Sequence, residues 1–309
     1  MKVLVTSNSF GKYDPAPAEK LRKAGFEVAY NPYGRMMEED EFIRQLQGAD
    51  AVILSTEKVT RRVLDHAPDL KMISRYGVGL DNVDLEYCRE KGIPVTVTKN
   101  GNSNAVAEYA VTLMLSAAKG IGASGFSARQ GKWKKFNGVD LTRKTIGIIG
   151  LGAIGKEVAR KLQGFEPQIL AYDICYDEAF LKNYNVHKAS MEELLKKSDV
   201  ITLHSPSQDE KPLLSEKEFE LMKDQVILIN TARASLIDYD VLLSAIDSGK
   251  IFAAGLDVHE HEPEFDERLM QYENIILTPH NAAITREAVD RTSMMAVDHI
   301  LTYFGKEPA

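Results

Sequence analysis

Three polar side chains that could transfer a proton and bind an acid lie shortly after aliphatic runs in the second half of the chain. They are Arg233, Glu262 and His280. An imidazole, whose pKa lies near neutrality, can exchange a hydroxyl proton, and a nearby carboxylate can orient the ring and stabilise its cation. A guanidinium binds a planar carboxylate and polarises a carbonyl oxygen. Together these side chains predict proton transfer on a small hydroxy or keto acid.

Each of these residues also has a purely structural interpretation. Taken alone, Arg233 would be a surface ion-pair partner, Glu262 a solvated loop acid, and His280 a packed or capping histidine. A metal cluster is a further alternative, because histidines alternate with glutamates in residues 259–262. One loop would then supply every ligand, and no CxxC or HExxH pattern accompanies it, so we expect no metal site.

A glycine-rich turn separates two apolar runs in residues 145–173, which read TIGIIGLGAIGKEVARKLQGFEPQILAYD. Gly150 permits a tight turn after the first run, Gly152 lets the backbone approach a pyrophosphate, and Gly155 lets the following helix pack closely on the sheet. That helix presents its N-terminal N–H groups to the phosphates. Asp173 closes the second run, where its carboxylate can bind a ribose and repel a 2′-phosphate. The segment therefore predicts a dinucleotide site that favours NAD over NADP.

Short aliphatic runs alternate with helical stretches along the whole chain, which is the pattern of parallel βαβ units. We expect an α/β protein of two Rossmann-like or flavodoxin-like parallel-sheet domains with a cleft between them. A helix over about 104–118 would link the domains, although glycines in 119–125 weaken the pattern after it. A last helix over about 286–304 has apolar residues spaced for one buried face. The expected strands are 3–5, 28–30, 51–54, 72–74, 95–97, 146–149, 169–172, 200–203, 226–229, 253–256 and 275–277.

The elements bring the polar residues together. In open α/β sheets, ligands bind beyond the carboxyl ends of the strands. Arg233, Asp257, Glu262 and His280 all follow expected strands, as the glycine turn does. We therefore expect them at one sheet edge, the edge where the dinucleotide is expected to bind. A histidine that exchanges a proton beside a nicotinamide is typical of an enzyme that transfers a hydride.

The composition is that of an ordinary globular protein, with 309 residues of which 44% are apolar and 27% charged. A net charge of −7 argues against nucleic acid and anionic membranes as partners, and the basic run at 132–135 is expected to be a solvated surface or an oligomer arm. No run approaches the ~20 apolar residues of a membrane span, and the N-terminus is typical of a strand, so we expect a cytoplasmic protein. Cys88 and Cys175 are expected to be buried free thiols.

Motifs spread along the chain resemble those of the D-isomer-specific 2-hydroxyacid dehydrogenase family, and within it the D-3-phosphoglycerate dehydrogenase branch. They are RYGVGLDNVDLEYCREKGIP at 75–94, GNSNAVAEYAVTLML at 101–115, the glycine turn, INTARASLID at 229–238, GLDVHEHEP at 255–263 and LTPH at 277–280. The resemblance implies a substrate-binding domain of residues 1–99 plus 283–309 and an NAD-binding Rossmann domain of residues 100–282.

The same resemblance implies a role for each site residue. His280 would be the acid/base, Glu262 its hydrogen-bonding partner, and Arg233 the group that orients the substrate's carboxylate and C2 oxygen. Hydride would pass between C2 and NAD while His280 exchanges the hydroxyl proton. The remaining implied contacts are Val78 and Gly79 for the carboxylate, Ala153 and Ile154 with the three glycines for the pyrophosphate, Asp173 for the ribose, and Ser205, Thr231 and Asp257 for the rest of the NAD site.

The branch implies interconversion of 3-phosphoglycerate and 3-phosphohydroxypyruvate, a step of serine biosynthesis. A substrate phosphate requires cations, and the candidates are Arg75, Arg35 and Lys12. Reduction of glyoxylate, hydroxypyruvate or another 2-keto acid is the main alternative. An alternative of another class is an NAD(H)-sensing corepressor with the same fold, which would bind NADH without turning over an acid.

Two departures from the family pattern affect these expectations. Asn281 follows His280, where the family often has an aliphatic residue, and this change is expected to bear on substrate preference. The chain ends at Ala309, so we expect no appended regulatory domain and no feedback control by serine through one.

Family members are usually dimers through the NAD domain, and residues 129–133 resemble the arm that reaches the partner. We therefore expect a homodimer.

Overall fold

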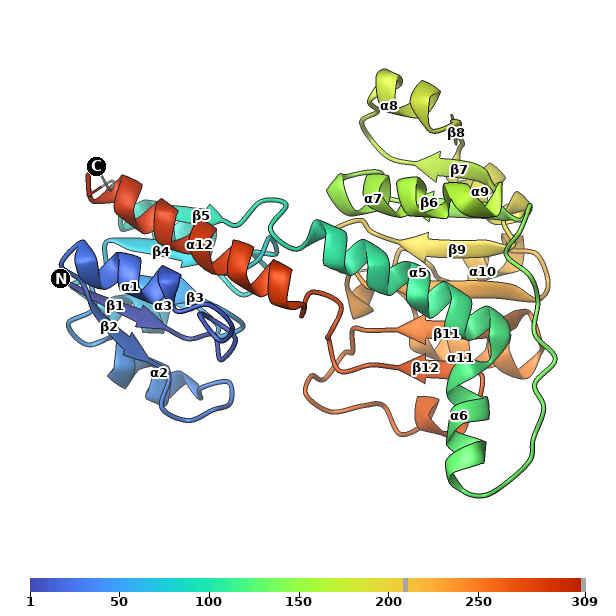
Figure 1. The fold of residues 1–309 in the computed structure, drawn as a ribbon, viewed down its shortest axis with the longest axis horizontal. Coiled ribbons are helices and arrows are strands. Elements are labelled where there is room, and N and C mark those ends of the chain that lie inside the picture. The colour runs from blue at the N-terminus through green and yellow to red at the C-terminus, as the bar shows by residue number, and fades with distance from the viewer. Residues whose placement is uncertain (208–210, 307–309) are drawn as a thin grey trace. The chain divides into compact units, whose positions relative to one another are not determined.

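The computed structural model describes residues 1–207 and 211–306 of the chain. It divides into two compact units, each built on a parallel β-sheet (Figure 1). Unit 1 comprises Met1–Asn102 and the described residues from Ala283 onward, and unit 2 comprises Ser103–Ala282. The expected α/β class with two parallel sheets is confirmed. None of the described helices is both long and apolar enough to cross a membrane.

Unit 1 contains a five-stranded sheet in the order β2-β1-β3-β4-β5. Aliphatic side chains that alternate along the strands fill a core on each face. Helices α1 and α12 cover one face, where Val3 and Val5 pack against Val297 and Ile300 of α12. Helices α2, α3 and α4 cover the other. The elements of unit 1 are β1 (Lys2–Val5), α1 (Ala16–Lys23), β2 (Glu27–Tyr30), α2 (Glu39–Leu46), β3 (Ala51–Leu54), α3 (Arg61–Asp65), β4 (Met72–Arg75), α4 (Leu85–Glu90), β5 (Val95–Val97) and α12 (Arg286–Tyr303).

Unit 2 contains a seven-stranded sheet in the order β12-β11-β10-β9-β6-β7-β8. Helices α5 and α7 cover one face, as Figure 1 shows, and α9, α10 and α11 contribute to the core on the other. Its helices are α5 (Ser103–Lys119), α6 (Ile121–Arg129), α7 (Ala153–Leu162), α8 (Glu178–Asn183), α9 (Met191–Lys197), α10 (Glu216–Leu221) and α11 (Tyr239–Asp247), and its strands are β6 (Thr145–Ile149), β7 (Gln168–Tyr172), β8 (Val186–Lys188), β9 (Val200–Leu203), β10 (Val226–Asn230), β11 (Ile251–Leu256) and β12 (Ile275–Leu277). Three short 3₁₀ segments are Gln163–Phe165, Ala234–Leu236 and Leu269–Gln271.

The order of strands in unit 2 determines where a ligand can bind. Strands β7 and β8 extend the sheet on one side of β6, whereas β9 to β12 extend it on the other. Loops that leave the sheet in opposite directions open a crevice at such a reversal, beyond the carboxyl ends of the central strands. The glycine turn directly follows β6, so it lies at this crevice.

Three expectations from sequence differ from the structure. The domain boundary lies between residues 102 and 103 rather than after 99, because α5 begins with Ser103. The glycine-rich stretch after α5 forms a second helix, α6, which starts after Gly120 in a left-handed conformation. Cys88 is buried in the core of unit 1, but Cys175 is exposed because it lies in the loop that follows β7.

Candidate active site

His280 and Glu262 form a close pair in unit 2. The Nδ1 atom of His280 lies 2.8 Å from Oε2 and 3.0 Å from Oε1 of Glu262. A carboxylate oxygen only accepts, so Nδ1 carries a hydrogen and the neutral ring has its lone pair on Nε2. Within residues 1–207 and 211–306 no side chain or backbone group hydrogen-bonds Nε2. The pair therefore presents a basic nitrogen that can take a proton from a bound hydroxyl.

The surroundings of Glu262 keep its carboxylate charged. Burial would raise its pKa, but the hydrogen bonds from His280 and from the His259 N–H, with the positive charge of the His280 ring when it is protonated, hold the pKa below its usual value. His280 and Glu262 remain 46% and 36% exposed at the side chain, so a solute can reach the ring. An oriented imidazole beside a charged carboxylate is an arrangement suited to general acid–base chemistry.

Asp257 holds the turn that carries His280. It follows β11 and is completely buried. Its carboxylate accepts hydrogen bonds from the backbone N–H groups of Asn281 and Ala282, both at 2.8 Å, and from the Thr278 hydroxyl at 2.6 Å. These bonds support His280 in a left-handed conformation with φ of 50°, which is costly for a residue with a side chain. Asp257 therefore holds the turn around His280, and its implied contact with NAD stays a prediction.

Arg233 is positioned by the buried side chain of Asn230 at the end of β10. The Nδ2 group of Asn230 donates to the Arg233 carbonyl at 2.8 Å, and its Oδ1 accepts from the Ala232 N–H at 2.9 Å. These two bonds form a small turn that fixes the backbone of Arg233 in an extended conformation. The half-buried guanidinium also donates to the Ala232 carbonyl at 2.7 Å.

The glycine turn is shaped by close contacts between backbone atoms. Gly150 has φ of 94°, and a Cβ there would lie 2.5 Å from the Ser205 backbone nitrogen. A Cβ on Gly155 would lie 2.1 Å from the Gly150 carbonyl oxygen. By contrast, a Cβ on Gly152 would meet no atom within 4 Å. The first and third glycines therefore serve packing within the protein, and the second leaves open space in front of helix α7.

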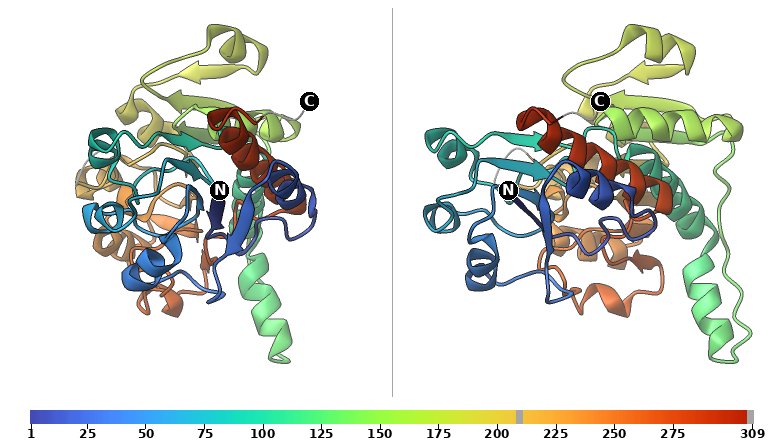
Figure 2. Two further views of the ribbon diagram at one scale, coloured as in Figure 1. Left: turned by 90° about the vertical axis from the view of Figure 1, so that its left-hand side faces the viewer. Right: turned by 60° about the vertical axis from the view of Figure 1, so that its left-hand side comes forward.

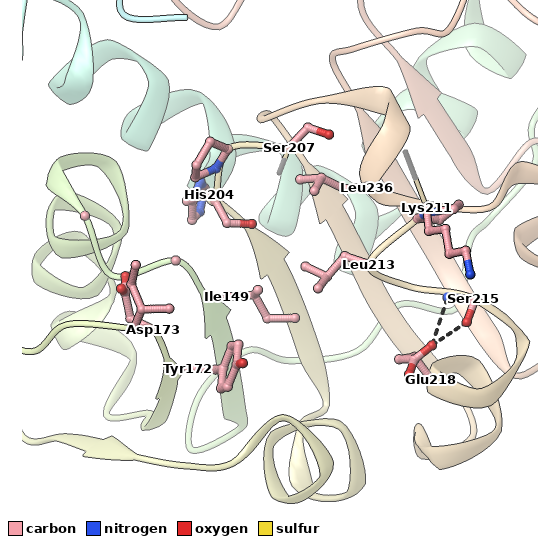
Figure 3. Close-up of a pocket in the computed structure, with 16 residues that line it drawn as sticks. Ile149, Tyr172, Asp173, His204, Ser207, Lys211, Leu213, Ser215, Glu218 and Leu236 are labelled. Atoms are coloured by element: carbon pink, nitrogen blue, oxygen red, sulfur yellow. Dashed lines mark hydrogen bonds between the residues drawn. The ribbon is translucent and has the colours of Figure 1, made fainter. Parts of the chain in front are cut away.

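A pocket of about 550 Å³ lies beside this turn at the end of β6 and β7 (Figure 3). Asp173 lies on one side, and Leu213 and Leu236 lie on the other. The Asp173 carboxylate accepts from the backbone N–H groups of Leu151 and Cys175, so it is anchored at the mouth of the turn. An apolar wall facing an anchored carboxylate suits a base attached to a ribose.

Several residues expected to contact NAD fit that cofactor. The Ser205 Oγ and Thr231 Oγ1 atoms are buried without a hydrogen-bond partner among the described residues, so both are available to polar groups of a ligand. Ala153 and Ile154 begin α7, where the first N–H groups of the helix have no partner within it. Together with the open space at Gly152, these groups match a pyrophosphate and the sugar next to it.

His204 lines the same pocket and was missed by the sequence analysis. Its Nε2 atom lies 2.9 Å from the Thr202 hydroxyl, and its Nδ1 is buried with no partner in the described part of the chain. Although part of the side chain faces the pocket, burial lowers the pKa of His204 to about 3. The signal that would have found it is its position directly after β9 at the same sheet edge.

The residues expected to bind substrate in unit 1 lie around the end of β4. Val78 is exposed, and the Gly79 carbonyl accepts from Arg75 Nε at 2.9 Å. Arg75 Nη1 also donates to the carbonyls of Tyr76 and Leu54, at 2.7 and 3.3 Å. Arg75 therefore organises the loop that carries Val78 and Gly79.

The other two cations considered for a substrate phosphate differ from each other. Arg35 forms a bidentate ion pair with Glu41, with both distances at 2.8 Å. Lys12 is exposed, and its Nζ lies 5.6 Å from the centre of the Tyr13 ring. Of the two, Lys12 is the one whose contacts leave its ammonium accessible to an anion.

The loop at 259–262 does not have the geometry of a metal centre. The imidazole of His259 is directed to the Thr278 carbonyl at 2.8 Å, and Glu262 is paired with His280. In the described part of the chain, no group of three His, Cys, Asp or Glu residues could hold a metal ion.

The chain is similar to known proteins along most of its length. Residues 111–282 match the model of the D-isomer specific 2-hydroxyacid dehydrogenase NAD binding domain. The chain is 39% identical over 306 residues to a D-3-phosphoglycerate dehydrogenase of Archaeoglobus fulgidus, covering 97% of this chain but 57% of that protein. It is 38% identical over 276 residues to a hydroxypyruvate reductase of Thermotoga maritima, covering 87% of this chain and 89% of that protein.

A solved structure shows the same fold with the cofactor in place. The D-lactate dehydrogenase from Aquifex aeolicus, complexed with NAD and lactic acid, superposes with a TM-score of 0.82 at 30% identity, covering 98% of this chain and 96% of that one. The cofactor of this protein is NAD, as the glycine turn and Asp173 predicted. The match over residues 111–282 and the similarity along nearly the whole length show that the chain belongs to the D-isomer specific 2-hydroxyacid dehydrogenase family.

Proposed function

We propose that the protein interconverts a D-2-hydroxy acid and its 2-keto acid with NAD. The observation that carries this proposal is the His280–Glu262 pair, with a separation of 2.8 Å, in the same unit as the pocket at the glycine turn. A nicotinamide dinucleotide supplies the hydride acceptor or donor. The reaction also needs a group that exchanges the hydroxyl proton, and His280 Nε2 is available for that exchange.

The proposed roles follow from the contacts of each side chain. In oxidation, neutral His280 takes the proton of the C2 hydroxyl on Nε2, and the Glu262 carboxylate on Nδ1 stabilises the cation that forms. In reduction, the imidazolium returns the proton to the C2 oxygen. Arg233 holds the substrate carboxylate and polarises the C2 oxygen, with its backbone fixed by Asn230. In unit 1, we assign substrate binding to the backbone N–H groups of Val78 and Gly79, as the family resemblance implies.

The first candidate substrate pair is 3-phosphoglycerate and 3-phosphohydroxypyruvate, which would place the enzyme in serine biosynthesis. Its support is the 39% identity to the Archaeoglobus phosphoglycerate dehydrogenase, of which this chain spans little more than half the length. Lys12, which is exposed and contacts the Tyr13 ring, is the cation that we assign to the phosphate.

A second candidate is an unphosphorylated keto acid such as hydroxypyruvate or glyoxylate. Two observations favour it. Arg75 donates to three backbone carbonyl groups, and Arg35 is paired with Glu41. These contacts occupy N–H donors that a substrate phosphate would need. The Thermotoga hydroxypyruvate reductase matches this chain over 89% of its own length.

The test is an NADH-absorbance assay with 3-phosphohydroxypyruvate, hydroxypyruvate and glyoxylate side by side. We expect His280→Ala to lower kcat by about 10²- to 10⁴-fold, which is the usual contribution of general acid–base catalysis. NADH binding, measured by fluorescence, should be unchanged because His280 is not part of the pocket at the glycine turn. A preference for the phosphorylated acid would identify the first candidate. Tight NADH binding with no turnover of any acid would refute the proposal and favour the corepressor-like class.

We also propose that the protein is a homodimer. Large apolar side chains are exposed on α6 and the segment after it, with Ile121 at 61%, Phe126 at 65% and Trp133 at 93%. In Figure 2, α6 extends away from the layered part of unit 2, and the chain returns beside it. Exposed aromatic groups gathered on a projecting element are typical of a surface that another subunit covers.

A further inference from the structure

His259 is the buried member of a loop whose next two residues, Glu260 and His261, are exposed. Only 8% of His259 is accessible. Its ring packs edge-on against Phe265, with centroids 4.7 Å apart and an interplanar angle of 72°. The packing against Phe265 restricts the orientation of the imidazole.

The ring of His259 bonds the segment that carries the proposed acid/base. Its Nε2 lies 2.8 Å from the Thr278 carbonyl oxygen, which can only accept, so Nε2 carries the hydrogen. The His280 N–H donates to the same oxygen at 2.9 Å. The other ring nitrogen, Nδ1, is buried and has no partner in the described part of the chain. In the described part of the chain, the ring therefore makes one hydrogen bond, in which Nε2–H donates to the Thr278 carbonyl.

The backbone of His259 bonds the other half of the pair. Its N–H donates to Glu262 Oε1 at 3.1 Å, the same oxygen that lies 3.0 Å from His280 Nδ1. A single buried residue thus contacts both the segment that leads into His280 and the carboxylate that orients the His280 ring.

Such support is needed because neither half of the pair is held by regular secondary structure. His280 has φ of 50°, a left-handed conformation that is costly for a residue with a side chain. Asp257 restrains the turn after His280 through Asn281 and Ala282. His259 restrains it before His280 through Thr278. The turn is therefore held from both ends.

We propose that His259 is a positioning residue for proton transfer, acting through Thr278 and Glu262 rather than on the substrate. The inference rests on the proposed function of the His280–Glu262 pair. Loss of the Nε2–H donor would let the turn at 278–280 relax, and the His280 Nε2 atom would lose its alignment with the C2 oxygen. Misplacement of a catalytic group by about 1 Å costs up to roughly 10²-fold in rate.

The experiment compares two substitutions in the full chain, measured with NADH and the best keto acid. His259→Phe keeps an aromatic ring against Phe265 but removes the donor, whereas His259→Gln places an amide N–H near the position of Nε2. We expect His259→Phe to lower kcat roughly 10- to 100-fold, to displace the pH profile of kcat/KM, and to leave KM for NADH unchanged. His259→Gln should recover most of kcat. His261→Gln, on the exposed histidine two residues away, is the matched control and should behave like the wild type.

The possible outcomes separate the inference from the function on which it rests. If His259→Phe keeps the wild-type kcat and pH profile, or only lowers the melting temperature, the residue is merely structural and the inference is overturned. If the phenylalanine variant does not fold, His259→Met provides the donor-free comparison. Failure of the proposed function would instead appear in the wild type itself, as NADH binding without turnover.

Discussion

Protonation of His204 is opposed by its surroundings at the end of β9. Burial lowers its pKa to about 3 from an ordinary value of 6.5. Between these two values the unfolded chain binds a proton at His204 that the folded protein does not bind, so falling pH favours unfolding. One pH unit in this range corresponds to about 1.4 kcal/mol from such a residue.

We therefore expect the free energy of unfolding to decrease as pH falls below 6.5, and to decrease less steeply in His204→Gln. The measurement is urea unfolding of both proteins between pH 7 and pH 5. Burial also lowers the pKa of His299, so this residue lowers the free energy of unfolding at acid pH in both proteins. The difference between the two slopes is therefore due to His204. Equal slopes in the two proteins would show that His204 is accessible to protons in the folded state.

Residue types alone do not reveal which polar groups bind ligand and which hold the protein together. Arg75 illustrates this point, because its sequence position suggested a substrate cation and its guanidinium bonds three backbone carbonyls. Asp257 illustrates it again, because its carboxylate accepts three hydrogen bonds from the turn around His280. Arg75 reaches Leu54 on the neighbouring strand, and Asp257 reaches residues 21 to 25 positions further along the chain, so no local pattern specifies these contacts.

At the scale of elements, the strand–turn–helix segment from β6 to α7 combines two different requirements. Gly155 must be small because the Gly150 carbonyl lies 2.1 Å from the position of a Cβ. Gly152 faces open space, so its small size serves a ligand rather than the protein. The same residue type therefore has separable roles at positions three residues apart.

Substitution of these two glycines by alanine should separate stability from cofactor binding. Gly155→Ala is expected to destabilise the protein by about 1–3 kcal/mol through overpacking, partly offset by the better helix propensity of alanine. Gly152→Ala should unfold like the wild type but bind NADH about tenfold more weakly, which is roughly 1.4 kcal/mol. Thermal unfolding and NADH titration test both. Normal NADH affinity in Gly152→Ala would mean that the pyrophosphate does not approach this turn.

At the scale of the whole molecule, the proposed dimer depends on α6 and the segment after it. Phe126→Lys combined with Trp133→Ala removes two of the largest exposed apolar side chains and adds a charge. We expect light scattering to give a dimeric mass for the wild type and a lower mass for the double variant. Met270→Ala, at a separate residue that is 62% exposed, is the control and should leave the mass unchanged. A monomeric wild type would contradict the proposal.

Much of the fold follows from local pattern. Aliphatic runs alternating with helical stretches predicted two parallel sheets, because the central strands of such a sheet are covered on both faces and are therefore largely apolar. The order of the strands was not predicted, because pairing depends on contacts between residues far apart in the chain. Helix α6 was not predicted either, because its glycines weaken the helical pattern of the sequence. In the folded unit the tertiary structure overrides this weak local preference.

The sequence by itself determined the dinucleotide site, because the three glycines and Asp173 lie within one strand–turn–helix–strand segment whose geometry is local. It also supplied His280 and Glu262 as candidates, since each follows a recognisable strand. Only the tertiary structure decided that they form a pair at 2.8 Å and that Asp257 and His259 restrain the turn between β12 and α12. It also decided that Arg75 on β4 donates to the Leu54 carbonyl on β3. These contacts join residues that are 18 to 25 positions apart or lie on different strands, and packing of the strands into a sheet brings them together.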